Sequence, residues 1–187
     1  MALAWGAASQ GGASDRALAD SLANDTTRQA AIASIMASGS SKVPLLLSWA
    51  RKPPRHVLGC GLDDGLADAF GELKTKEAIP FLIKNIGMYR SCGVSLGPWL
   101  KGPAAIEWNL PAVGALVKIG ADASKGVIAE FHDIAEENRM AAIFVVSQIK
   151  GVPEAQVFLA AAVGRANGER YWAEEGIKLL DASPSPR

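Results

Sequence analysis

Two stretches of this sequence share one pattern, and that pattern limits the folds open to the chain. Residues 66–82 read LADAFGELKTKEAIPFL, and residues 111–128 read PAVGALVKIGADASKGVI. Each consists of an amphipathic segment rich in small residues, a polar turn and a second apolar segment. A single helical hairpin cannot bury its own apolar face, so such hairpins stack side by side. The repeat therefore predicts an all-α protein built from stacked helical hairpins.

The composition fits close packing of helices in one domain. Hydrophobic residues make up 49% of the 187 residues, and most are Ala, Leu, Ile and Val. Ala combines a high helix propensity with little bulk. Lys plus Arg and Asp plus Glu number 19 each. Because general binding to nucleic acid or to an anionic membrane needs a surplus of basic residues, this balance argues against both. We also expect no membrane span, since no continuous apolar run is long enough.

Helix signals divide the chain into a short first helix and four hairpins, each with a first helix A and a second helix B. Ser14 and Asp15 can cap the first helix. The hairpins are expected at 26–51, 62–88, 109–135 and 137–166, and a closing helix at 168–181. In the second hairpin the apolar spacing places on one side Leu62, Leu66, Ala69, Phe70 and Leu73, and on the returning helix Ile79, Leu82, Ile83 and Ile86.

Residues 89–108 break this rhythm with an irregular insertion that is rich in Gly and Pro. Long irregular insertions within compact repeats are often functional. Tyr89, Trp99 and Trp108 lie here and are the main binding candidates, because aromatic side chains bury much area at low entropic cost. The alternative is that these rings only pin the insertion onto the helices. The packed domain is expected to cover residues 14–181, with this insertion inside it.

The two ends are expected to lie outside the packed domain. Residues 1–13 resemble the end of a signal peptide and its small-residue cleavage zone, although a basic segment is missing. A flexible leader is the alternative. A signal remnant would make the protein exported or periplasmic, which we favour over a cytoplasmic location. The Pro- and Ser-rich tail at 182–187 cannot continue a helix, and we expect it to be disordered.

The second and third hairpins resemble HEAT-like repeats, of the type seen in phycobilisome lyases and many bacterial proteins. The matching positions are Ala69, Phe70, Leu73 and Ala78 to Leu82, then Ala115, Leu116, Ile119 and Val127, together with Arg28 and Arg139 at the start of helix A. The resemblance covers about residues 26–165. It implies a right-handed α-solenoid of about four hairpins, and its motifs specify a fold rather than an activity.

Polar motifs give few signs of chemistry. The adjacent carboxylates Asp63–Asp64, Glu136–Glu137 and Glu174–Glu175 point about 100° apart on a helix, so they do not converge on a substrate. His132 lies in a helix B, where it would either contact a ligand or serve as an ordinary surface histidine. Two cysteines and two distant histidines do not offer the four ligands of a structural zinc site. We therefore expect no metal and no cofactor.

These features predict a non-enzymatic scaffold that binds a protein or peptide. The partner would lie on the concave face formed by the B helices, with the insertion at its rim. The family resemblance provides an alternative, a lyase-type enzyme or accessory protein that handles a chromophore or another small molecule. Nucleic-acid binding would need a basic stripe along successive B helices, and these carry few Lys or Arg residues.

We predict a disulfide between Cys60 and Cys92 in protein from an oxidising compartment. Cys60 precedes helix A of the second hairpin and Cys92 follows helix B, so an antiparallel pair brings both to the same end. Their Cα atoms can then approach to the roughly 4.4–6.8 Å that the bond requires. Intact-mass measurement of the native protein, with and without reductant before alkylation, checks this. Two thiols that alkylate without reduction would rule out the bridge, and would weaken the argument for export.

Overall fold

The computed structural model describes residues 8–57, 61–90 and 103–163, and every regular element in these ranges is helical. The prediction of an all-α protein is therefore confirmed for this part of the chain. The helices are α1 (Ala8–Ala23), α2 (Arg28–Ser38), α3 (Val43–Arg51), α4 (Leu62–Leu73), α5 (Ile79–Lys84), α6 (Pro103–Asn109), α7 (Pro111–Ile119), α8 (Ala121–Glu130), α9 (Arg139–Lys150) and α10 (Val152–Val163). Short 3-10 turns at Gly39–Lys42, Lys76–Ala78 and Glu136–Asn138 precede α3, α5 and α9.

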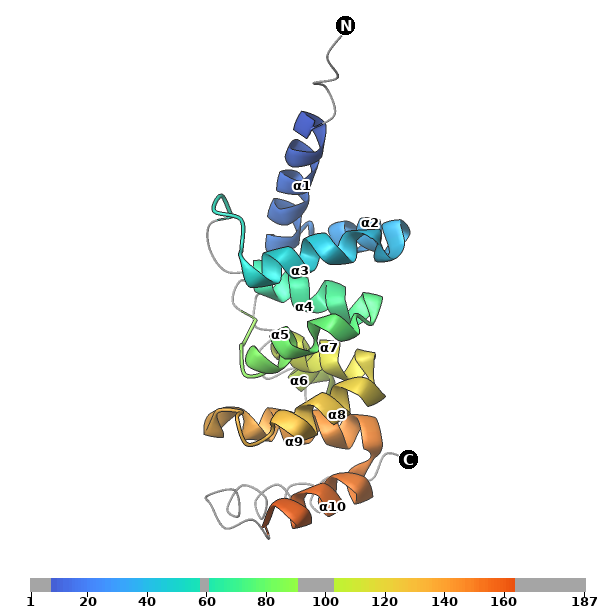
Figure 1. Cartoon of the computed structure of the whole chain (residues 1–187), viewed down its shortest axis with the longest axis vertical. Coiled ribbons are helices and arrows are strands. Elements are labelled where there is room, and N and C mark those ends of the chain that lie inside the picture. The colour runs from blue at the N-terminus through green and yellow to red at the C-terminus, as the bar shows by residue number, and fades with distance from the viewer. Residues whose placement is uncertain (1–7, 58–60, 91–102, 164–187) are drawn as a thin grey trace, which may run out of the picture.

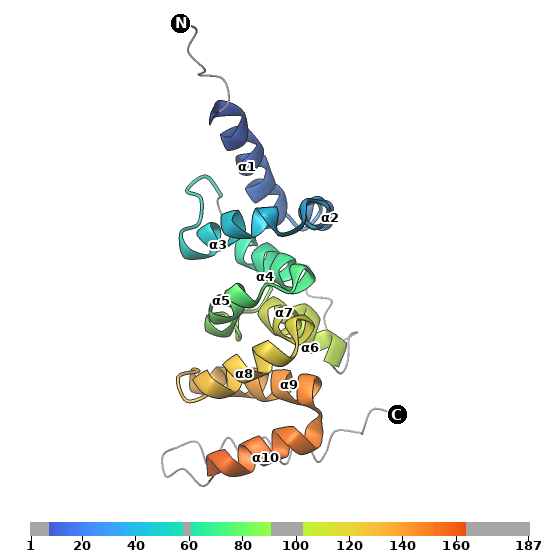
Figure 2. The same cartoon turned by 45° about the vertical axis from the view of Figure 1, so that its right-hand side comes forward.

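The helices follow one another along the long axis of the molecule, from α1 at one end to α10 at the other (Figures 1 and 2). Helices α2, α4, α7 and α9 correspond to the expected A helices, and they pack on one another in that order. The contact between α4 and α7 is the most extensive. Among the expected B helices, α5 packs on α8. The A helices thus form a continuous layer that joins the two halves of the described chain.

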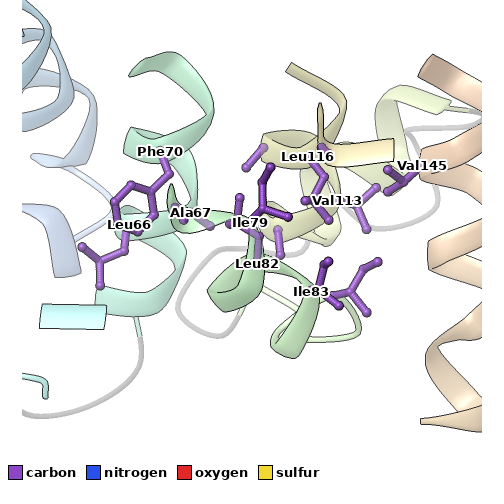
Figure 3. Packing of buried hydrophobic residues seen from close by; sticks show 14 of the residues in the cluster. Leu66, Ala67, Phe70, Ile79, Leu82, Ile83, Val113, Leu116 and Val145 are labelled. Atoms are coloured by element: carbon purple, nitrogen blue, oxygen red, sulfur yellow. The ribbon is translucent and has the colours of Figure 1, made fainter. Parts of the chain in front are cut away.

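One hydrophobic core runs through this layer. Leu66 and Phe70 of α4, Leu82 of α5 and Leu116 of α7 are fully buried within it (Figure 3). The apolar spacing of the sequence predicted eight core residues in this hairpin that are all buried. They are Leu62, Leu66, Ala69, Phe70, Ile79, Leu82, Ile83 and Ile86. Leu73, the last residue of α4, is only partly buried. Helical periodicity therefore identified the core side of both helices in this hairpin.

Helix α1 begins earlier than the capping signal indicated. It starts at Ala8, so Ser14 and Asp15 lie inside it and do not cap it. The part of the expected leader from residue 8 onward is therefore helical, since the Ala-rich sequence propagates a helix through its glycines. Residues 1–7, the closing helix expected at 168–181 and the tail at 182–187 lie outside the described residues.

Two arginines tie A helices to the chain that precedes them. Arg139, the first residue of α9, donates from Nε to the Ile134 carbonyl at 3.2 Å and from Nη2 to the His132 carbonyl at 3.3 Å. Arg28, the first residue of α2, donates from Nε to the Leu22 carbonyl at 3.0 Å. Arg28 thus bonds a carbonyl that the end of α1 leaves open, whereas Arg139 bonds carbonyls of the turn that follows α8.

Arg28 does more than Arg139, because it lies buried where α1, α2 and α4 meet. Its Nη2 atom lies 2.7 Å from Asp25 Oδ1 and 4.0 Å from Oδ2 of the fully buried Asp64 in α4. It also donates to the Gly61 carbonyl at 3.4 Å. A buried charge needs such partners, because removing it from water costs several kcal/mol. Removing one partner of a buried pair typically destabilises a protein by ~3–5 kcal/mol. This network fixes how α4 approaches the first two helices.

The helical run Arg28–Arg51 is long and apolar enough to cross a membrane by length and composition alone, and this leaves the expectation of no membrane span untested. Buried core helices and signal sequences meet the same criterion. Within this run Gly39 has a φ of +60° and ends α2, so the run consists of two helices of 11 and 9 residues. At about 1.5 Å per residue, neither helix alone reaches across a hydrocarbon core of about 30 Å.

Glycine allows α4 and α7 to approach closely. A Cβ atom built on Gly71 of α4 would lie 2.8 Å from the Cα atom of Ala115 in α7, and 3.1 Å from its Cβ. Gly65, on the other side of α4, would meet the Leu22 carbonyl oxygen of α1 at 2.4 Å. Because these neighbours are backbone atoms, no side chain can move aside. Small residues on α4 and α7 are therefore a condition of this packing.

We predict that Gly71→Ala destabilises the protein although Ala is the better helix former. The added methyl group forces α4 and α7 apart, which should lower the free energy of unfolding by about 1–3 kcal/mol. Gly126→Ala in α8 is the comparison, because there the new methyl group would also lie 2.8 Å from its nearest neighbour, but this neighbour is a side-chain methyl group of Ile79 and not backbone. Chemical denaturation measures both variants. An unchanged or higher stability of Gly71→Ala would contradict the close approach.

Candidate functional site

A groove of about 260 Å³ lies among α2, α4, α6 and α7. Its apolar lining includes Ile32 of α2, Trp108 of α6 and Pro111 of α7. Its charged lining consists of Asp68, Glu72, Arg90, Glu107 and Lys118. The A-helix layer forms the floor, and α6 stands beside α7 as one wall. The site is thus a surface groove with a mixed polar and apolar lining, built where the insertion rejoins the helices.

Arg90 holds this groove together. Its guanidinium donates to both carboxylate oxygens of Asp68, at 2.9 and 3.1 Å, and from Nε to the Trp108 carbonyl at 3.0 Å. It also lies 4.8 Å from the centre of the Trp108 ring. The Arg90 backbone N–H donates to the Asn109 carbonyl at 2.8 Å. Arg90 therefore ties the end of α6 to α4, at both the backbone and the side chain.

Arg90 stays positively charged although its side chain is largely buried. Burial acts to lower the pKa of the guanidinium, since only 9% of the side chain is exposed. The hydrogen bonds and the negative charge of Asp68 outweigh this effect, and the pKa of Arg90 lies above its ordinary value. A planar guanidinium matched to a carboxylate by two parallel bonds is among the stronger pairs in proteins. The pair is therefore a permanent part of the groove wall.

The remaining charges of the groove differ in how far they are engaged. Lys118 Nζ lies 2.7 Å from Glu72 Oε1, but both side chains are nearly half exposed, so this pair contributes only about 0.2–1 kcal/mol. Glu107 of α6 is half-buried, and its side-chain carboxylate forms no hydrogen bond or ion pair with any residue that the structure describes. Among the groove's carboxylates, Glu107 is thus the one left available to a ligand.

The structure places the predicted site residues in different locations. Trp108 lines the groove and is 41% exposed, and Tyr89 precedes Arg90 with 72% of its surface exposed. His132 lies apart from them in the turn after α8, exposed, with Nε2 3.1 Å from Oδ2 of its neighbour Asp133. Trp99, Cys60 and Cys92 lie outside the described residues. Of the four candidates, then, Trp108 and Tyr89 belong to one region and His132 to another.

The described C-terminal part of the insertion is helical, where the sequence predicted irregular structure. Residues 103–109 form α6, with Pro103 at its first position, where a missing N–H costs nothing. The groove that contains Trp108 lies beside the A helices α2, α4 and α7, whereas we expected the insertion at the rim of the B-helix face. Residues 91–102 of the insertion lie outside the described residues. The Arg90–Asp68 pair joins the described start of the insertion to α4.

A second groove, of about 300 Å³, lies on the B-helix side between α5 and the end of α8. Its lining includes Lys84, Glu130 and Asp133 and contains no aromatic side chain. Within residues 8–57, 61–90 and 103–163, no group of three or more His, Cys, Asp or Glu residues is arranged to hold a metal ion. Trp108 and its exposure therefore distinguish the first groove as the stronger candidate.

Sequence reasoning missed the charged residues of the groove. Asp68 and Arg90 are 22 positions apart, and Glu72 and Lys118 are 46 apart. No short motif joins residues at such separations. The available signal was an arginine next to Tyr89 in the insertion and two acids, Asp68 and Glu72, beyond the first turn of the otherwise small and apolar helix α4.

We predict that Arg90→Met loosens α6 while the A-helix layer stays folded. Losing the two parallel hydrogen bonds to Asp68 should speed amide hydrogen exchange across residues 103–109 about tenfold or more. Lys118→Met, which removes only an exposed pair, is the matched control and should leave this exchange unchanged. Hydrogen exchange read by mass spectrometry compares the two variants. Unchanged exchange of 103–109 in Arg90→Met would show that Arg90 does not hold α6.

Comparison with known proteins identifies no relative. No protein-family model, no curated protein and no solved structure matches this chain. The resemblance to HEAT-like repeats therefore rests on the residues quoted above, and function has to be argued from the groove.

Proposed function

We propose that this protein is a non-enzymatic scaffold, a right-handed α-solenoid of about four HEAT-like hairpins that binds a protein or peptide. The ordered packing of α2, α4, α7 and α9 supports the repeat, as does the packing of α5 on α8. Arg28 and Arg139 add support, because they perform the same task at the start of two A helices. Stacked hairpins present extended surfaces that suit macromolecular partners.

The exposed Trp108 in the groove carries the binding proposal. Tyr89, Ile106 and Trp108 are three of the five large hydrophobic side chains that stand out as exposed in the described part of the chain. All three belong to the insertion. Large rigid side chains near a groove are typical of binding hot spots. Arg90 holds α6 in place, so a partner would meet a surface that is already ordered, which lowers the entropic cost of binding.

This proposal moves the partner from the B-helix face to the A-helix side of the molecule. The groove there is lined by α2, α4, α6 and α7, and its rim includes the exposed aromatic ring. The B-side groove beside α5 and α8 has a similar volume but no aromatic lining. Aromatic anchors contribute more to protein recognition than isolated charges do.

The lyase-type alternative has less support. Acid–base chemistry needs a group within reach of the substrate and free to exchange its proton. Of the five charged side chains in the groove, Asp68 and Arg90 engage each other, as do Glu72 and Lys118. Such pairs suit recognition better than proton transfer. Glu107 alone is unengaged by described residues, and a single carboxylate is weak support for acid–base chemistry.

We predict that Trp108→Ala weakens partner capture by the full-length protein at least thirtyfold. This is roughly what losing a hot spot of about 2 kcal/mol entails. Quantitative affinity capture from native lysate, followed by titration of the captured protein, measures the loss. Val157→Ala removes an even more exposed apolar side chain from α10, far along the stack, and is the control.

A variant on the B-helix side tests on which face of the molecule the partner binds. His132→Ala should leave capture unchanged, because His132 lies apart from the groove. Ile106→Ser serves as a second A-side variant, since Ile106 is exposed and its loss should not unfold the core. Circular dichroism confirms that each variant stays folded. Capture that survives both A-side changes but falls in His132→Ala would contradict the assignment.

A further inference from the structure

The groove carries an excess of negative charge. Three carboxylates and two cationic groups line it, which leaves one net negative charge. Asp68 uses both of its oxygens on Arg90, and Glu72 uses Oε1 on Lys118. Glu107 uses neither oxygen on any described residue. The excess charge is therefore located on Glu107, on the same helix as Trp108 and one residue before it.

A partner that covers this groove has to deal with that charge. Glu107 is half-buried now, and an apolar segment laid over Trp108 would remove more water from its carboxylate. Dehydrating a carboxylate without a replacement for its hydrogen bonds is strongly unfavourable. Arg90 is poorly placed to supply the replacement, because Asp68 already balances its charge and three of its five N–H donors are engaged by Asp68 and the Trp108 carbonyl. Lys118 is paired with Glu72. A cationic group on the partner would supply the missing compensation.

The groove also suits the shape of a basic side chain. Ile32, Pro111 and Trp108 provide apolar surface beside the carboxylate. Lys and Arg pack their methylene stems on such surface while the charged end reaches a polar group. A charge-assisted hydrogen bond to Glu107 would then offset the loss of water.

We propose that the segment bound in this groove is a peptide that carries a Lys or Arg next to an apolar residue, and that Glu107 receives the basic side chain while Trp108 receives its neighbour. This inference rests on the proposed function. In this proposal Glu107 makes binding specific for segments with a basic residue, and Trp108 contributes most of the binding free energy for any segment.

Selection of short random peptides displayed on phage, with the full-length protein as the target, tests this. Binders should be enriched in Lys or Arg. A synthetic binder should bind Glu107→Gln about tenfold more weakly or worse, with a smaller dependence on salt than for the unchanged protein. Glu130→Gln in the second groove is the matched control and should bind as the unchanged protein does. Replacing the basic residue of the peptide with Gln should reproduce the loss.

The outcomes separate this inference from the proposed function. Binders that need Trp108 but lack basic residues and ignore Glu107→Gln would overturn the charge assignment and leave the scaffold proposal standing. Binders indifferent to Trp108→Ala, or no binders at all, would overturn both. Glu107→Gln preserves shape on a partly exposed side chain, and thermal unfolding checks that it remains folded.

Discussion

The contact between α4 and α7 is the constraint on which the rest of the described structure depends. These two helices approach so closely that a methyl group on Gly71 would collide with the backbone at Ala115. Phe70 of α4 and Leu116 of α7 are fully buried in the hydrophobic core that this packing helps to enclose. It also joins the N-terminal helices to the C-terminal ones, since α4 contacts α1 and α2 whereas α7 contacts α8 and α9. Small residues are thus essential at this crossing.

The groove is a consequence of that crossing. Bringing α4 beside α7 aligns Asp68 and Glu72 with Lys118, and it provides a floor on which α6 can rest. Arg90 then neutralises Asp68 and holds the end of α6. The result is an ordered surface on which an exposed aromatic ring and a carboxylate are adjacent. Trp108 offers area, and Glu107 offers a charge that nothing in the described part of the molecule satisfies.

The sequence predicted the all-helical core well and the groove poorly, for physical reasons. Burial of Leu66, Phe70 and Leu82 follows from a period of about 3.6 residues, which local sequence records. The start of α1 was missed because a capping residue is only a weak local signal and Ala-rich sequence continued the helix. The pairing of Asp68 with Arg90 depends on how two distant segments meet, and helical periodicity contains no information on that.

The hydrogen bond between the Arg90 N–H and the Asn109 carbonyl has a consequence for how this chain can evolve. Two positions far apart in the sequence meet at this one backbone bond, so the end of α6 is held against the residue that follows α5 whatever sequence joins them. The entropic cost of closing such a connection rises only slowly with its length. Insertions or deletions between Arg90 and Pro103 therefore need not move α6 or the A helices on which it packs.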